Sequence, residues 1–298
     1  LQAGDTLNIR SGTYIPAYPI VLHSDYRSRE DRTRGGDPNE IMNAQTGTAS
    51  QPVTVRVYPG DPKGSVVIDA AGKTTLINLD NKSYWTFDGL KIINTSRAFL
   101  VGEDTTSTNN TFQNLDITMS IGGDNHGAIT LGGIATEGAK VHNNKIVGPP
   151  APSCLISNNA PGCTHGNTAG VFVGRIENVT ITNNEISRAP IGIYYKHTNF
   201  GSGTNIRIAN NYIYDTSRNS IQLNSRYAVV ENNIIGLNSG SLLFAEANGN
   251  SGGDYNTVIH NTILSGGLSL PYETQDLRFP PLYTLVPDTM PGSIRNII

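Results

Sequence analysis

Gly192-Ile-Tyr-Tyr-Lys-His197 is the stretch of sequence that decides the fold. Other segments align with it without gaps, and they begin at Ala98, Ala128, Gly170, Ser220 and Ser241. The second and fourth positions of the set are apolar in every segment. They are Phe99, Ile129, Val171, Ile193, Ile221 and Leu242 at the second position, and Val101, Leu131, Val173, Tyr195, Leu223 and Phe244 at the fourth. Because side chains alternate between the two faces of a strand, these segments are predicted to be short strands that share one interior and stack in register.

The remaining positions of these segments are expected to face outward. The first position holds small residues throughout: Ala98, Ala128, Gly170, Gly192, Ser220 and Ser241. The third is mixed: Leu100, Thr130, Phe172, Tyr194, Gln222 and Leu243. The fifth holds Gly102, Gly132, Gly174, Lys196, Asn224 and Ala245. Positions with little or no side chain would leave an open trough along the strands, in which Tyr194 and Lys196 stand up.

A second pattern recurs between these segments: a Gly, Asn or His, then two residues, then an isoleucine. It occurs at Gly89–Ile92, Asn114–Ile117, Asn143–Ile146, Asn183–Ile186, Asn210–Ile213, Asn232–Ile235 and His260–Ile263. The variable intervals between its copies are those of a coil of short strands with loops inserted at the corners. The asparagines suit a turn in left-handed backbone, where side-chain amides can hydrogen-bond from coil to coil.

The composition agrees with a turn-rich β protein. Of the 298 residues, 15% are charged and 32 are glycine, and asparagine is frequent. The formal net charge is −3, whereas a nucleic-acid-binding protein usually shows a basic patch or stripe. No stretch approaches the ~20 apolar residues of a membrane span. We therefore expect neither a nucleic-acid nor a membrane partner, and we expect a monomer.

The two cysteines, Cys154 and Cys163, lie in one loop-like stretch. A disulfide between them would crosslink an inserted loop and would imply an oxidising compartment. Two free thiols are the alternative. With the disulfide, the expected location of the protein is extracellular, after secretion.

Several N-terminal motifs resemble a known superfamily. They are Ala3-Gly-Asp-Thr-Leu7, Gly12-Thr-Tyr14, Gln51-Pro-Val-Thr-Val55 and Tyr84-Trp-Thr-Phe-Asp-Gly-Leu90. They look like the N-terminal coils of alginate lyases, chondroitin lyases and family 9 pectate lyases, and with the coil pattern the resemblance to the pectate-lyase-like superfamily covers roughly residues 4–270. It implies an all-β fold, a single-stranded right-handed parallel β-helix (a solenoid) with loop insertions.

The fold implied in this way is a single domain over residues 1–298. N-terminal coils occupy residues 1–83 and contain a long polar loop at 24–50, and regular coils occupy 84–270. A proline-rich extended segment follows at 271–298. Its final Ile-Arg-Asn-Ile-Ile reads as the start of another coil that is cut short.

The resemblance also implies a chemistry, the cleavage of an acidic polysaccharide by β-elimination. The related alginate and chondroitin lyases use a lysine base and an arginine on neighbouring coils. Lys196 matches the lysine in type and place, and Arg226 is the nearest candidate for the arginine. The longer Asn-x-x-x-x-x-x-Lys-Ser and Arg-His-Gly signatures of those lyases are missing here. Alginate is the favoured substrate, followed by pectate or another glycuronan.

Such a reaction needs a base, an acid and donors that neutralise the uronate carboxylate. Lys196 is the expected base, and Tyr194 or Arg226 the expected acid. The expected substrate contacts are Asn224, Gln222, Arg175, His197 and Phe172. His197, His126 and His165 are single histidines at turns, for which a structural role is the alternative.

Other readings of the same fold stay open. A glycoside hydrolase needs two or three carboxylates about 5–10 Å apart, and the outward positions of the aligned segments contain none. A C5-epimerase and a non-catalytic surface β-helix that binds glycans are further alternatives. The need for a cofactor is undetermined, with Ca²⁺ as one option. The acidic residues considered for it are Glu103, Asp104, Glu246 and Asp254.

Overall fold

The computed structural model describes most of the chain from Leu1 to Ser269. The described residues are 1–23, 40–79, 81–102, 106–123, 125–132, 137–149, 167–174, 176–196, 205–225, 227–236, 239, 241–244, 256–264 and 268–269. Within these ranges the regular structure consists of β-strands. Among the same residues, no helix has the length and apolar character needed to span a membrane.

The described strands form three parallel sheets. Sheet A contains β1 (Thr6–Ile9), β5 (Val53–Val57), β8 (Trp85–Asp88), β11 (Thr111–Gln113), β14 (Lys140–His142), β17 (Thr180–Thr182), β20 (Arg207–Ala209), β23 (Val229–Glu231) and β26 (Thr257–Ile259). Sheet B contains β2 (Gly12–Tyr14), β6 (Val66–Asp69), β9 (Lys91–Thr95), β12 (Asp116–Met119), β15 (Lys145–Val147), β18 (Glu185–Ser187), β21 (Tyr212–Tyr214), β24 (Ile234–Ile235) and β27 (Thr262–Ile263). Sheet C contains β4 (Glu40–Asn43), β3 (Ile20–His23), β7 (Thr75–Leu79), β10 (Arg97–Val101), β13 (Gly127–Leu131), β16 (Ala169–Gly174), β19 (Ile191–Lys196), β22 (Asn219–Leu223), β25 (Ser241–Phe244) and β28 (Leu268–Ser269).

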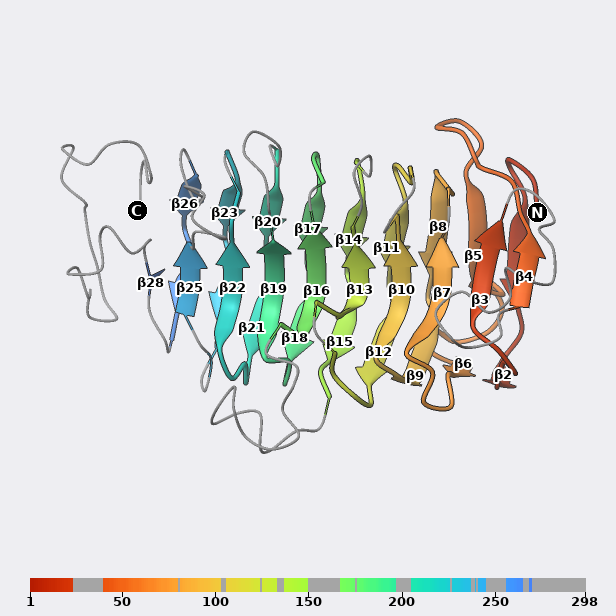
Figure 1. The fold of residues 1–298 in the computed structure, drawn as a ribbon, viewed down its shortest axis with the longest axis horizontal. Coiled ribbons are helices and arrows are strands. Elements are labelled where there is room, and N and C mark those ends of the chain that lie inside the picture. The colour runs from red at the N-terminus through yellow and green to blue at the C-terminus, as the bar shows by residue number, and fades with distance from the viewer. Residues whose placement is uncertain are drawn as a thin grey trace.

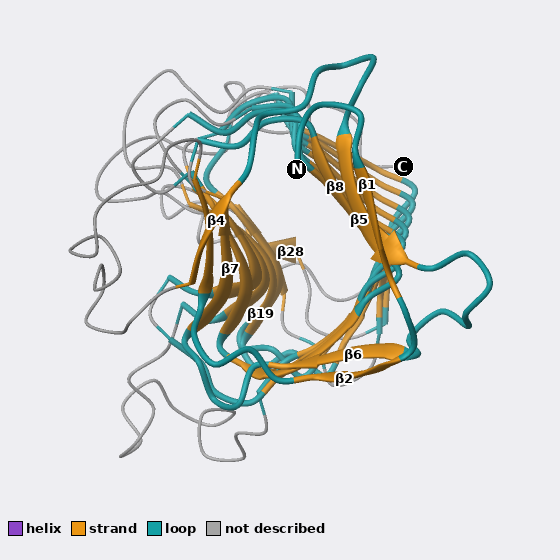
Figure 2. Ribbon diagram, turned by 90° about the vertical axis from the view of Figure 1, so that its right-hand side faces the viewer, coloured by secondary structure: helices purple, strands orange, loops and turns teal. Residues whose placement is uncertain are grey.

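Apart from β3 and β4, which follow each other in sheet C, successive strands of the chain pass from sheet A to sheet B to sheet C, and each pairs with the strand one coil away. Figure 1 shows the coils stacked along the long axis of the molecule, with the N-terminus at one end. Seen from that end, the three sheets enclose one interior (Figure 2). The predicted fold is confirmed: the chain is a right-handed parallel β-helix.

The prediction of a loop over residues 24–50 is wrong for residues 40–43. Residues 40–43 form β4, which pairs in parallel with β3 at the outer edge of sheet C. A strand can add to an existing sheet edge through its backbone groups alone, so its sequence need not alternate between apolar and polar residues. Residues 24–39 and 271–298 lie outside the described residues, and the predictions made for them stay predictions.

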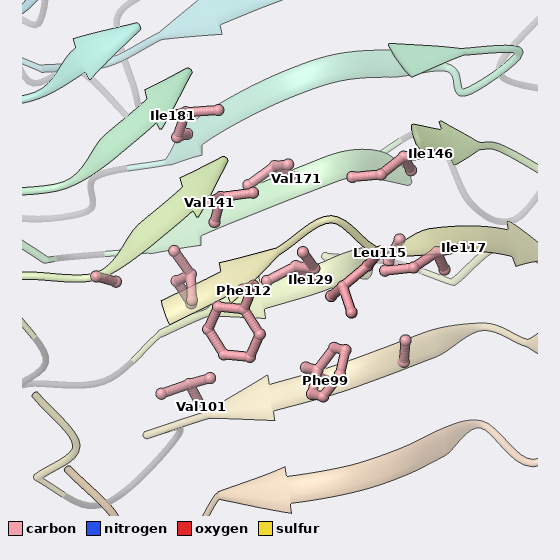
Figure 3. Packing of buried hydrophobic residues seen from close by; sticks show 14 of the residues in the cluster. Phe99, Val101, Phe112, Leu115, Ile117, Ile129, Val141, Ile146, Val171 and Ile181 are labelled. Carbon is pink, nitrogen blue, oxygen red and sulfur yellow. The ribbon is translucent and has the colours of Figure 1, made fainter. Parts of the chain in front are cut away.

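The register predicted for the two apolar positions is confirmed. Phe99 pairs with Ile129, and the row continues through Val171, Ile193, Ile221 and Leu242. All of these side chains are buried in one core. Figure 3 shows part of it, in which Phe99 and Phe112 point toward each other between the sheets; their ring centroids are 4.9 Å apart.

Tyr195 is the polar exception in the inward rows. Its side chain is fully buried, and its hydroxyl donates to the backbone carbonyl of Ile176 at 2.9 Å. Burial raises the pKa of the Tyr195 phenol far above its ordinary value, so the phenol stays a neutral hydrogen-bond donor. The large ring fits the core because this one polar atom has an acceptor.

The expectation that the small first position faces outward is wrong. A Cβ added to Gly170 would lie 2.5 Å from Cγ2 of Ile186, and one added to Gly192 would lie 2.6 Å from Cγ2 of Ile213. Both isoleucines belong to the core, as do Ala98 and Ala128. Two consecutive residues therefore face inward near the start of β10, β13, β16 and β19, which interrupts the alternation as a β-bulge does. At Gly170 and Gly192 the residue is small because the corner isoleucine of the following coil already fills the space.

One alignment of this first position also shifts. Ser241 pairs with Asn219 rather than with Ser220, and the register changes before the pair Ile221–Leu242. The shift is confined to the start of these two strands, so the apolar rows remain aligned.

Gly192→Ala is expected to destabilise the fold by about 2–3 kcal/mol, since the new methyl group would meet the backbone oxygen of Ser220 at 2.4 Å in a packed core. Gly132→Ala is the matched control, because a Cβ there meets nothing within 4 Å. Urea unfolding followed by circular dichroism measures both variants. Equal stability of the two variants would show that the first position does not face the core.

The prediction of a left-handed asparagine turn is confirmed. The first residue of the corner pattern has positive φ in every described copy, from 52° at Asn232 to 78° at Gly89. The predicted coil-to-coil amide bond occurs where Nδ2 of Asn143 donates to Oδ1 of Asn114. A longer amide ladder is formed, mostly in the core, by the residue that follows the turn position. Its members are Asn144, Asn184, Asn211, Asn233 and Asn261, and each amide nitrogen donates to the next amide oxygen at 2.9 Å. This ladder satisfies the backbone N–H groups of the corner, which would otherwise be buried without acceptors.

Candidate functional site

Lys196 ends β19 on the outward side of sheet C. Its backbone pairs with Gly174 on the preceding coil, and Asn224 follows on the next coil, where its N–H donates to the carbonyl of Tyr195 at 3.1 Å. The Lys196 side chain is half-buried, and its Nζ donates to Oδ1 of Asn125 at 2.9 Å. The amine therefore lies outside the barrel, as the sequence predicts.

The glycines of the fifth position give the amine open surroundings. A Cβ added to Gly132 would meet nothing within 4 Å. One added to Gly174 would approach the ring of Phe172 at 3.4 Å, an ordinary contact distance. Open space at this end of the strands is thus found beside Gly132, the small first position contributes none, and the trough along sheet C stays a prediction.

Tyr194 does not stand up in an open trough. It is 5% exposed and packs with Ala169, Phe172 and Ile191 in a small apolar cluster on the outside of sheet C. The Phe172 and Tyr194 rings meet edge to face at 5.5 Å. Gly127 of the preceding coil approaches Phe172 closely, because a Cβ on it would lie 2.9 Å from Cβ of Phe172. Both rings consequently present little surface to a ligand, which corrects the expectation drawn from the alternation alone.

Gln222 lies beside Tyr194 on the next coil. Its Oε1 accepts a hydrogen bond from Nδ2 of Asn219 at 2.9 Å, so its amide nitrogen is turned to the other side as a donor. Asn224, which follows two residues later, is 6% exposed. The structure therefore groups Lys196, Gln222 and Asn224 on neighbouring coils, with the buried Tyr194 between them.

A polar group next to this site was not predicted. Oδ1 of Asn125 accepts from Nδ2 of Asn167 at 3.2 Å as well as from Lys196. His126 follows Asn125, and its Nδ1 lies 2.8 Å from Oγ of Ser96. Asn125 and His126 come from the corner before β13, Asn167 comes from the corner before β16, and Ser96 lies at the end of the corner before β10. Strand alternation fixes no side-chain direction at a corner, so the sequence carries no signal for them beyond the Asp-Asn-His-Gly run.

The protonation of His126 follows from its neighbours. Its Nε2 lies 3.5 Å from Nη2 of Arg97, and a guanidinium can only donate. We assign Nε2 as the acceptor, so Nδ1 carries the proton and donates to Ser96. Arg97 is held in turn by Thr75 at 3.1 Å. The structural role considered for His126 fits this arrangement.

The other predicted site residues lie outside the described residues. They are Arg175, Arg226, His197, His165, Cys154, Cys163, Glu103, Asp104, Glu246 and Asp254. Their proposed roles, including the disulfide, stay predictions. In the part of the chain that the structure describes, no cluster of three or more His, Cys, Asp or Glu side chains is placed to hold a metal ion.

No protein family model and no curated protein matches the sequence. Several solved structures are similar in fold. An alginate lyase from Paenibacillus sp. strain FPU-7 matches with a TM-score of 0.45 and 14% identity, over 90% of this chain and 91% of that chain. The A-module of the Azotobacter vinelandii mannuronan C-5 epimerase AlgE6 matches with a TM-score of 0.34 and 14% identity, over 90% and 89%.

A third similar structure is the catalytic domain of a GH87 α-1,3-glucanase, with a TM-score of 0.26 and 15% identity over 95% of this chain and 63% of that chain. All three are parallel β-helices. The overlaps are loose, so the likeness concerns the fold, and the fold assignment rests on the three sheets of the chain itself. One such scaffold carries many chemistries, and the site has to be argued from its own residues.

Proposed function

We propose that this chain is a polysaccharide lyase that cleaves a uronic-acid-containing polymer by β-elimination. The observation that carries the proposal is the Lys196 amine, held at 2.9 Å by a neutral amide on the outside of sheet C, in line with Gly174 and with Gly132, at which an added Cβ would meet nothing within 4 Å. Alginate is the favoured substrate, followed by pectate or another glycuronan. We also propose that the protein acts outside the cell as a monomer.

The reaction needs one proton removed and one supplied. The neutral amine of Lys196 takes the proton from C5 of the uronate. The electron pair of that C–H bond forms the C4=C5 double bond, and the C4–O bond to the neighbouring sugar breaks. The departing oxygen takes a proton from an acid, for which Arg226 is proposed, because the ring of Tyr194 is buried. Asn125 accepts one N–H of the amine and so leaves the nitrogen lone pair for the substrate.

The uronate carboxylate must be neutralised before C5 loses its proton. The amide nitrogen of Gln222, turned outward by Asn219, suits this task, and Asn224, Arg175 and His197 are the further proposed contacts. Strands β7, β10, β13, β16, β19 and β22 contain no Asp or Glu. An anionic polymer therefore meets no carboxylate from these strands, which favours an acidic substrate and disfavours a two-carboxylate hydrolase.

Gln222→Glu is expected to lower kcat/KM on alginate about tenfold or more, because a donor to the carboxylate is replaced by a like charge. The loss is expected mainly in KM, and it should shrink at high salt. Asn78→Asp is the matched control, since Asn78 lies in the same outward row of sheet C at β7, several coils away. If both variants lose activity equally, general repulsion explains the effect and Gln222 makes no specific contact.

A polymer panel tests the proposal. The purified protein is incubated with alginate, pectate, glucuronan and chondroitin, with and without chelator, and the ultraviolet absorbance of the unsaturated uronate is followed together with reducing ends. The proposal expects both signals to rise together. Reducing ends without the absorbance indicate a hydrolase, and altered uronate composition at constant length indicates a C5-epimerase. Binding without any change in the polymer indicates a glycan-binding module.

A further inference from the structure

We propose that Asn125 is a positioning residue, which holds the amine of Lys196 in the orientation needed for proton abstraction. The effect of this orientation on catalysis rests on the proposed function. The contact itself is a 2.9 Å hydrogen bond from Nζ to Oδ1 of Asn125. Asn167 donates to the same oxygen at 3.2 Å, which fixes the amide with its oxygen toward the lysine.

Three successive coils meet at this point. Asn125 lies in the corner before β13, Asn167 in the corner before β16, and Lys196 at the end of β19. The amide of Asn125 thus reaches across the coil of β16 to the lysine. Asn125 is not a neighbour of Lys196 on the same strand. The contact forms only if the corners that carry Asn125 and Asn167 both keep their conformation.

The corner that carries Asn125 is held on both sides by threonine hydroxyls. Oγ1 of Thr168 accepts from the N–H of Gly123 and donates to its carbonyl, both at 3.0 Å. Oγ1 of Thr130 does the same for Gly127, at 3.0 Å and 3.2 Å. Both threonines are buried. These paired bonds fix the backbone on each side of Asn125.

His126 completes the support. Its carbonyl accepts from the N–H of Ala169 at 2.8 Å, and its ring is held by Ser96. The group that contacts Lys196 is therefore supported by further contacts that fix it in place before any substrate arrives. This is the arrangement that a precisely oriented base requires.

The choice of an amide is chemically specific. An amide oxygen accepts an N–H from the amine whether or not the amine is protonated, so it orients Lys196 without holding a proton on it. A carboxylate at the same place would stabilise the ammonium form and remove the base. The backbone of Asn125 has φ of 55°, a conformation that Asn, Asp and Gly adopt most readily. Asp and Gly can therefore replace Asn125 with little backbone strain.

Two variants separate orientation from charge. Asn125→Gly removes the contact and is expected to lower kcat on alginate about 10- to 100-fold with little change in KM. Asn125→Asp adds an ion-pair partner and is expected to move the rising limb of the pH–rate profile to higher pH by about one unit or more. Asn143→Asp is the matched control, because Asn143 has φ of 58° at a corner between sheets A and B. A purely structural Asn125 would give lower stability with an unmoved pH profile, which would overturn the inference.

A second measurement needs no substrate. The rate at which an amine-acylating reagent labels Lys196 is followed by peptide mass spectrometry near neutral pH. We expect slower labelling in Asn125→Asp than in the wild type, and wild-type labelling in Asn143→Asp. Unchanged labelling in Asn125→Asp would overturn the inference even if the protein is a lyase. If the labelling slows as expected but no uronate polymer is cleaved, the proposed function fails and the positioning contact stands.

Discussion

Replacing Lys196 with alanine is expected to lower the rate of unsaturated product formation from alginate about 10³-fold, within the range that a positioned acid or base contributes. The reason is chemical, because the variant retains the outward surface and lacks the amine that takes the C5 proton. The fold should not change, since the Lys196 side chain lies outside the core on a half-buried surface. Initial rates of absorbance increase measure the effect.

Two controls make this result specific. Lys196→Arg keeps the positive charge but cannot act as a base near neutral pH, so it should be about as inactive as the alanine variant. Lys145→Ala removes a lysine from sheet B whose Nζ lies 3.7 Å from Glu185, and it should retain wild-type rates. If Lys196→Arg keeps most of the activity, the lysine serves as a charge for substrate binding and the base is another residue.

Asn184→Leu is expected to lower the free energy of unfolding by about 3–4 kcal/mol. Oδ1 of Asn184 accepts from the backbone N–H of Asn144 at 3.0 Å, and Nδ2 donates to Val141 and Asn211. Leucine has nearly the same size and replaces none of these bonds. One buried N–H then loses its acceptor, at about 1–3 kcal/mol, and three further hydrogen bonds, one of them from Nδ2 of Asn144, are lost at about 1 kcal/mol each. Burial of the apolar leucine side chain offsets part of this loss.

The neighbouring residue provides the control. Asn183 is exposed and has φ of 58°, so Asn183→Asp should change stability by less than about 0.5 kcal/mol. Urea unfolding compares the two variants at the same corner. Equal effects at the two positions would mean that the buried ladder contributes little to the cohesion of the coils.

The interior of the fold was predictable because its signal is repeated. Rows such as Phe99–Ile129–Val171 are apolar on coil after coil, and the apolar rows kept their register. The direction of Gly170 and Gly192 was not predictable, since the alternation breaks near the strand start. A glycine carries no side chain whose polarity would show the face. The position of the amide ladder was missed for a similar reason: Asn183 and Asn184 are the same residue type with opposite roles.

The site was predictable in part. Lys196 was found because it is the one charged residue in a row otherwise occupied by small or neutral residues, and the structure gives it the outward direction that was expected. Asn125 was missed because it belongs to a corner from another coil, and contacts between corners depend on local backbone conformation rather than on a period. The burial of Tyr194 was missed because it depends on packing against Ala169, Phe172 and Ile191 on the outside of the sheet, which the alternation alone does not reveal.

The mass of the new non-reducing ends in an alginate digest tests the central claim most directly. The account predicts that wild-type protein produces chain ends that lack the elements of water, each carrying the C4=C5 double bond, and that Lys196→Ala produces almost none. Ends of full hydrated mass from the wild type, or unsaturated ends formed equally well by Lys196→Ala, would contradict it.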